Sequence, residues 1–231
     1  MVGAMKRLAA LAALVALLMA FAWRARPRPL LFAPSFDAAL ASARAGGEWV
    51  VVHVRSSGRP LGSRMDHETL SSPLVRRSAA ADFLHVRLDV EREPELAARF
   101  AGSGAALSTL VVDERGELVA RRDGWLDAEG FVAFLDAVRA HRPALDAARR
   151  RLDADERDDA ARVDLAAGLA ELGASDRAEL ELRRTLATED DATRARAVAL
   201  LADLLAARGQ IAASEALRRE LADSYPAAPS R

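Results

Sequence analysis

Between residues 35 and 140, hydrophobic and polar positions alternate between the period of a helix and that of a strand. Phe36, Leu40 and Ala43 have helical spacing, and Gly46-Gly47 ends that predicted helix. The run from Trp49 to Val54 is rich in β-branched residues, which is typical of a buried strand. The later segments predict a polar helix ending near residue 70, strands over 83–90, 107–112 and 118–122, and helices over 94–100 and 127–140.

Short motifs lie along these elements in a fixed order. They are Met65-Asp66-His67-Glu68-Thr69, Ser72-Pro73, Leu88-Asp89-Val90, Pro94-Glu95-Leu96-Ala97, Ser108-Thr109-Leu110-Val111, Asp113-Glu114-Arg115-Gly116 and Gly124. Together with the order of elements, the motifs resemble the thioredoxin-like domains of exported bacterial disulfide reductases and their relatives. The resemblance implies an α/β thioredoxin fold, with a central mixed sheet flanked by helices, over residues 33–142.

The positions that carry redox chemistry in that family hold other residues here. The resemblance places the Cys-x-x-Cys motif on Arg59, Pro60, Leu61 and Gly62. It places the buried strand acid on His53 and the cis-proline on Ser108, so we expect the Leu107–Ser108 peptide bond to be trans. The sequence has no cysteine, and thiol–disulfide exchange requires a thiolate. We therefore expect a protein of this lineage that is not an enzyme.

The segment from Pro143 onward reads as short amphipathic helices, with the proline at a first helical position. Residues 165–173 match 201–209, and residues 181–187 match 216–222, at offsets of 36 and 35. This period is near the 34 residues of tetratricopeptide repeats, which the segment 143–226 resembles. A chance likeness between two Ala/Leu/Arg-rich hairpins is the alternative, and it also predicts an all-α array. Residues 227–231 are expected to form a disordered tail.

The first helix of each repeat is expected to line a concave face that binds a partner. The residues it would present are Arg162, Asp164, Glu171, Arg194 and Arg196. Their mixed charge suits an extended peptide or a partner helix. The net charge of −1 does not fit a nucleic-acid binder. Because the connection over residues 140–143 is short, we expect the array to dock on the preceding domain.

The amino terminus carries an export signal. Lys6 and Arg7 precede an uncharged apolar run from Leu8 to Trp23, which is shorter than the roughly 20 residues of a spanning helix. Residues 1–23 are therefore interpreted as a signal peptide or a membrane anchor, and both readings stay open. Residues 24–32 are interpreted as a linker, and the remainder as periplasmic or otherwise outside the cytoplasm.

Other polar residues give weaker signals. Asp66, His67 and Glu68 are adjacent on a predicted helix, so their side chains diverge, and we expect no metal and no cofactor. His53 and His85 lie on strands that neighbour each other in this fold and can approach, as core histidines. The basic loop with Arg55, Arg59 and Arg64 is either an anion site or solvated surface.

The chain is 51% hydrophobic, enough for a sizeable core, so these patterns belong to folded domains. The sequence favours a redox-inactive, thioredoxin-like binding or scaffolding protein of the cell envelope. One alternative is an oxidoreductase-related protein that assists disulfide transfer through a partner's cysteines. Another is a structural domain that helps to assemble an envelope complex.

Overall fold

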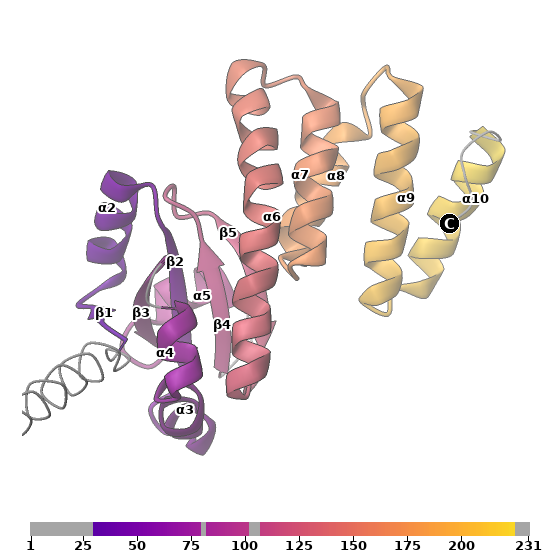
Figure 1. Ribbon diagram of the computed structural model, residues 1–231. Helices are drawn as coiled ribbons and strands as arrows, with labels where there is room; N and C mark the ends of the chain where they lie inside the picture. The colour runs from indigo at the N-terminus through magenta and orange to yellow at the C-terminus, as the bar shows by residue number, and fades with distance from the viewer. Residues whose placement is uncertain (1–29, 80–81, 102–106, 225–231) are drawn as a thin grey trace, which may run out of the picture.

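The computed structural model describes residues 30–79, 82–101 and 107–224, and it shows an α/β part followed by a row of helices (Figure 1). Five strands form one sheet in the order β1-β3-β2-β4-β5. Strands β1, β2 and β3 are parallel, whereas β4 is antiparallel to β2 and β5 is antiparallel to β4. The strands are β1 (Phe32–Ala33), β2 (Trp49–Arg55), β3 (Phe83–Asp89), β4 (Leu107–Val112) and β5 (Leu118–Asp123).

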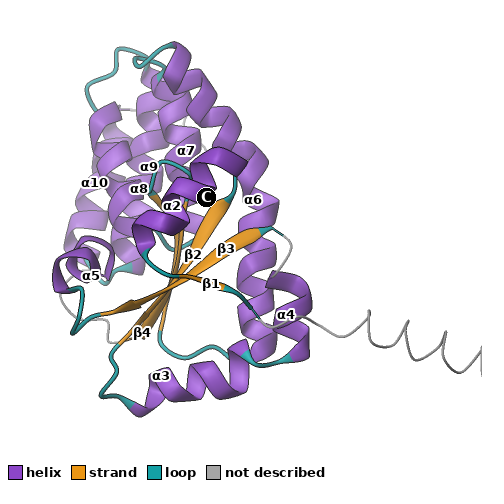
Figure 2. Ribbon diagram, turned by 90° about the vertical axis from the view of Figure 1, so that its left-hand side faces the viewer, coloured by secondary structure: helices purple, strands orange, loops and turns teal. Residues whose placement is uncertain are grey.

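Helices cover both faces of this sheet (Figure 2). Helices α2 (Phe36–Gly46) and α5 (Pro94–Ala101) lie on one face, where they pack against Val50, Val52 and Val54 of β2. The opposite face, with Trp49 and Val51, is covered by α4 (Pro73–Ala79) and the first half of α6 (Ala128–Ala154). Helix α3 (Pro60–Arg64) continues into a π-helical segment, Met65–Leu70.

The strand order and the connections are those of the thioredoxin fold, so the predicted fold of this part is confirmed. The predicted strands agree with β2 to β5 to within one residue. Strand β1 was not predicted, because two residues are too few to show an alternating pattern. Phe32 lies in the segment interpreted as a linker, and the buried Leu30 also belongs to the core. Residues 24–29 of that linker, like residues 1–23 and 227–231, lie outside the described residues.

Helix α6 corrects the expectation of two helices separated near residue 142. It runs without a break through Pro143, so the prediction that this proline begins a helix is wrong. A proline inside a helix removes one hydrogen bond and crowds the preceding turn. Burial on both sides of the proline outweighs that cost, because Leu135 and Val138 pack on the sheet side and Leu145 and Ala148 are buried beyond it.

The remaining helices form two hairpins, as the internal similarity predicts. They are α7 (Asp159–Glu171), α8 (Ser175–Thr185), α9 (Asp191–Ala207) and α10 (Ile211–Ser224). Asp158 and Asp190 cap the first helix of each hairpin through their side chains. Each hairpin turns at a glycine with positive φ, Gly173 at 81° and Gly209 at 75°. Helix α7 packs on α6, α8 and α9, so the helices stack into one array.

The array is docked on the edge of the sheet, as expected from the short connection. The backbone N–H of Arg121 in β5 donates to the carbonyl oxygen of Leu172 at 3.0 Å, which covers part of that edge. Arg177 of α8 donates to the carbonyl oxygen of Leu118 at 2.8 Å. A buried ion pair between Arg149 of α6 and Asp113 in the β4–β5 turn completes the contact.

Alanine at Gly173 is expected to cost about 2 kcal/mol of unfolding free energy, against about 1 kcal/mol at Gly209. Both positions are left-handed, but a Cβ at Gly173 would lie 2.6 Å from the carbonyl oxygen of Arg121. A Cβ at Gly209 meets nothing within 4 Å, so Gly209→Ala is the matched control. Urea denaturation of both variants measures the difference, and equal losses would contradict the close approach.

Among the described helices, none has the length and apolar character that a membrane crossing requires. The run from Leu8 to Trp23 lies outside the described residues, so the export signal stays a prediction.

Candidate functional site

Residues 56–62, here called the remnant loop, comprise the connection from β2 and the beginning of α3. The resemblance places the redox motif in this segment. Arg59 is the N-terminal cap of α3, Pro60 and Leu61 are exposed in its first turn, and Gly62 is buried against Arg55. Residues 59–62 therefore lie at the start of the helix that follows β2. Their side chains offer a guanidinium and apolar groups, but no nucleophile.

Two arginines bind one carboxylate beside this loop. Asp66 accepts from Nη1 of Arg55 at 2.8 Å and from Nη2 of Arg87 at 2.9 Å. Arg55 ends β2 and Arg87 lies on β3, so the pair bridges two strands to the π-helical segment that carries Asp66. The Asp66 side chain is 22% exposed. This cluster fixes the start of the helix against the sheet.

A second carboxylate orders the beginning of the loop. Glu91 accepts from the hydroxyl of Ser56 and, at 3.1 Å, from the backbone N–H of Ser57. The N–H of Glu91 in turn donates to Oδ1 of Asp89 at 3.0 Å. Hydrogen bonding with the side chain of Glu91, and then with its backbone N–H, lowers the pKa of Asp89. Hydrogen bonds to the Glu91 side chain therefore order the beginning of the loop.

Ser108 occupies the cis-proline position at the start of β4. It pairs with Val54 of β2, and its hydroxyl donates to Oδ1 of Asp123 at 2.7 Å. The described part of the chain has no cis peptide bond, so the Leu107–Ser108 bond is trans as expected.

His53 and His85 meet beneath the remnant loop. Nε2 of His53 lies 3.1 Å from Nδ1 of His85, and Nε2 of His85 lies 3.1 Å from the carbonyl oxygen of Ala79. Since a carbonyl only accepts, His85 carries its proton on Nε2 and its Nδ1 accepts from His53. Burial lowers the pKa of His85 to about 4 and holds the pKa of His53 well below its usual value, with His85 and Arg87 adding to the effect on His53. Both imidazoles are therefore neutral at pH 7.

The basic loop does not form a cluster of free cations. Arg55 is paired with Asp66, and Arg64 binds Glu68 at 2.8 Å while lying 3.8 Å from the ring centre of Trp125. Arg59 alone among these three has no acidic partner within the described residues. The geometry thus favours the solvated-surface interpretation over an anion site. His67 and Glu68 are exposed, and no three potential ligands converge on a metal position within the described ranges.

Restoring the two cysteines by Arg59→Cys and Gly62→Cys is expected to give at most weak reduction of insulin disulfides. The new thiols would stand at the start of α3, but Ser108 and the neutral His53 would still replace the proline and the acid of active relatives. The measurement compares turbidity development with that of the wild-type chain. A rate approaching that of an ordinary thioredoxin would contradict this account.

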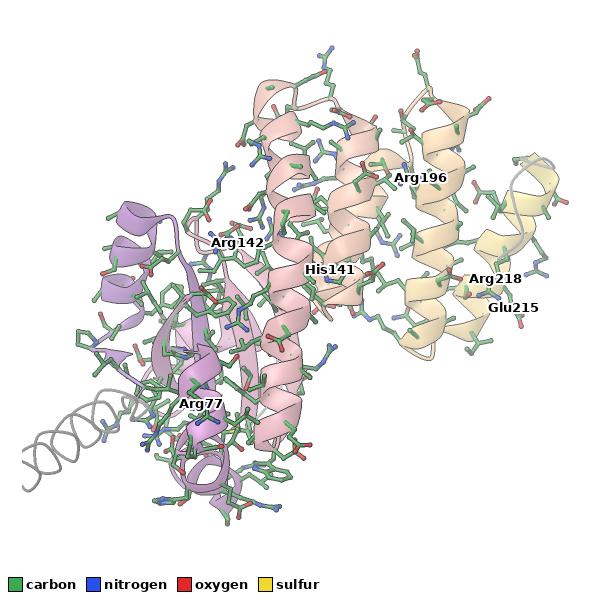
Figure 3. The ribbon with its side chains drawn as sticks, viewed as in Figure 1. Arg77, His141, Arg142, Arg196, Glu215 and Arg218 are labelled. Carbon is green, nitrogen blue, oxygen red and sulfur yellow. The ribbon has the colours of Figure 1, made fainter. Side chains whose placement is uncertain are left out.

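The predicted partner-binding residues of the array are engaged in contacts with side chains of neighbouring helices, and one of these contacts joins two of the predicted residues. Asp164 of α7 binds Arg196 of α9 at 2.7 Å and Arg151 of α6 at 3.2 Å. Arg194 reaches Glu220 of α10 at 3.9 Å. Figure 3 shows His141 on α6 toward α7, where its Nε2 lies 2.6 Å from Glu171; this contact raises the pKa of His141. These side chains tie adjacent helices together and are only partly available to a partner.

Arg162 lies instead in the wall of a hollow at one end of the array. Its guanidinium binds Glu181 at 3.1 Å and Asp159 at 3.7 Å. The hollow has a volume of about 820 Å³ and lies between the α6–α7 loop, α7, the end of α8 and the α8–α9 loop. Its lining is mostly charged or polar: Glu156, Arg157, Asp159, Arg162, Arg184, Ala187, Thr188 and Glu189.

The fold and this site define a thioredoxin-like chain that has no cysteine and cannot carry out thiol–disulfide exchange. No protein-family model matches the chain, and no curated protein matches its sequence. Three solved structures illustrate what it is similar to. A thioredoxin from Thermus thermophilus is 29% identical with a TM-score of 0.44, over 49% of this chain and 90% of that one.

An oxidoreductase named DsbH is 17% identical with a TM-score of 0.41, over 50% of this chain and 85% of the other. Trxlp from Edwardsiella tarda is 24% identical with a TM-score of 0.37, over 44% and 95%. Each of these TM-scores is below 0.5, so the assignment of the fold rests on the strand order and connections given above.

Proposed function

We propose that this chain is a non-catalytic binding protein of the cell envelope whose helical array recognises a polypeptide partner. The observation that carries the proposal is the large hollow at the loop end of α6 to α9. Pockets for small molecules are mostly apolar, with few polar groups. A lining of both charges suits a polar polypeptide segment, whose own charges and backbone find partners there.

The packing of the array supports a tetratricopeptide-like architecture. The two hairpins repeat at an offset of 36 between their turn glycines, Gly173 and Gly209. Helix α7 contacts both α8 and α9, as the first helix of a repeat does in a stack of helical hairpins. Glu215 and Arg219 are both exposed on α10. Such polarity is typical of a terminal helix.

The hollow is tested with two double variants of the full chain. Arg157→Ala with Glu189→Ala removes two exposed charges from the lining, and neither residue has an ion-pair partner in the described ranges. Arg219→Ala with Glu215→Ala removes the same two residue types from α10 and is the control. We expect envelope polypeptides that are captured by the wild-type and control chains to be lost from the hollow variant. Equal capture by all three chains would exclude the hollow as the binding site.

The envelope location rests on Lys6-Arg7 and the apolar run that follows them. A reporter enzyme fused after Arg231 and active only outside the cytoplasm is expected to be active. Activity restricted to a cytoplasmic reporter would overturn the location while leaving the binding role of the array open.

A further inference from the structure

Strand β1 is the shortest element of the sheet, and it packs on the two buried histidines. Phe32 pairs with His85 and Ala33 with Val86, and these two pairs join β1 to β3. The ring of Phe32 packs edge-to-face with both imidazoles, its centre 5.6 Å from that of His53 and 6.2 Å from that of His85. Phe32 is partly exposed, whereas the histidines are 5% and 3% exposed. Phe32 therefore belongs to the layer that separates the two histidines from solvent.

The surroundings of the two histidines are unfavourable to a positive charge. Within the described residues, neither His53 nor His85 has a carboxylate as an ion-pair partner. From β3, Arg87 repels a positive charge on His53. From α6, Phe131 stacks on His53 with 5.8 Å between ring centres, and α4 contributes the carbonyl oxygen of Ala79, which His85 already uses. A proton added to either imidazole would therefore create a buried charge without compensation.

The other described elements beside the pair supply no free anion. On β4, the residue opposite His53 is the uncharged Thr109. On the π-helical segment, Asp66 already binds two arginines, at 2.8 and 2.9 Å. A protonated histidine is therefore stabilised only where water reaches it. The smallest rearrangement that admits water moves the partly exposed Phe32 together with its two-residue strand, because short edge elements open at the lowest free energy.

We propose that β1 is a pH-sensitive switch: acid separates it from β3, while the rest of the sheet stays folded. Burial lowers the pKa of His85 to about 4, and hydration returns it toward the usual 6.5 when Phe32 leaves. Burial lowers the pKa of His53 in the same way. Protonation therefore favours the separated state as the pH falls below 6.5. Through His85 alone, the ratio of separated to paired molecules grows about 100-fold between pH 7 and pH 4.

Hydrogen exchange of the full chain tests the switch, with rates corrected for the intrinsic effect of pH. The amides that pair β1 with β3 should lose about 100-fold of their protection between pH 7 and pH 4. Because this opening is local, low concentrations of urea should hardly change their exchange. The amides that pair β2 with β4 should open only by global unfolding, so their exchange should respond strongly to urea. Protection of β1 that is independent of pH, or that shows the same response to urea as β2, would overturn the proposal.

The variant His53→Gln with His85→Gln removes both titrating groups, so its β1 amides should keep nearly the same protection at pH 7 and pH 4. His67→Gln is the matched control, because His67 is exposed on the π-helical segment and its loss should leave the wild-type pH dependence unchanged. An undiminished loss of protection in the double variant would also contradict the switch. If the double variant does not fold, the response of the wild-type amides to pH and urea decides the question.

Discussion

Replacing Arg149 by methionine is expected to lower the free energy of unfolding by about 3–5 kcal/mol, the usual cost of leaving one charge of a buried pair without its partner. The Asp113 side chain is 0% exposed and that of Arg149 is 7% exposed. Burial raises the pKa of Asp113, although Arg149 and the hydrogen bond from Glu117 act in the opposite direction. Removing the guanidinium therefore leaves Asp113 either ionised in the interior or protonated at a cost. Urea denaturation at pH 7 measures the loss.

The double variant Asp113→Asn with Arg149→Met is the control for that experiment. Oδ1 of Asp113 accepts from the backbone N–H groups of Arg115 and Glu117, and an asparagine oxygen can keep these contacts. We expect the double variant to regain most of the stability lost by Arg149→Met. If the double variant lost as much stability as Asp113→Asn and Arg149→Met lose together, the two charges would not interact.

Acidification is expected to remove about 3 kcal/mol of stability between pH 7 and pH 4 through His85 alone. Its folded pKa is about 4 and its ordinary value is 6.5, so the unfolded chain binds the additional proton in this window. The stabilisation is fully present above pH 6.5 and is lost as the pH falls through the folded value. His53 acts in the same direction, because burial lowers its pKa as well.

The variant His53→Gln with His85→Gln isolates this effect, since an amide can hydrogen bond but does not titrate. Its stability should change much less than that of the wild type between pH 7 and pH 4. His141 remains in the variant and acts in the opposite direction, because Glu171 raises its pKa and favours folding at lower pH. If denaturation experiments showed that the stability of both chains falls equally between pH 7 and pH 4, the two buried histidines would not be the source of the pH dependence.

Much of the α/β part could be predicted from the sequence because its elements carry strong local signals. The β-branched run of β2 and the glycines that end α2 are examples. Strand β1 has two residues and gains its structure from pairing with β3, which no local pattern reveals. The sequence interpretation began a helix at Pro143, because proline usually interrupts a helix. In the structure, burial on both sides of this proline in α6 outweighs that local effect.

The candidate site was predictable in position but not in its contacts. The motifs located Arg59, Gly62, Ser108 and His53, and the neighbouring strands allowed for the meeting of His53 with His85. The hydrogen bonds from Arg55 and Arg87 to Asp66 depend on the side-chain conformations of residues on three separate elements. Sequence spacing does not reveal such contacts. Glu91 was missed for the same reason. In the array, the partner-binding residues were predicted from their charge. The structure shows that such residues form ion pairs between helices, as Asp164 does with Arg196.

Helix α6 sets the distance between the remnant loop and the hollow of the helical array. Its 27 residues give a length of about 40 Å. The sheet and α3 lie near its beginning (Figure 1). The hollow is lined by residues of the loop that follows its last turn. A polypeptide held in the hollow, as proposed, would therefore leave α3 and the remnant loop uncovered. If the proposed polypeptide partner binds in the hollow, the remnant loop near the beginning of α6 stays accessible to a second molecule.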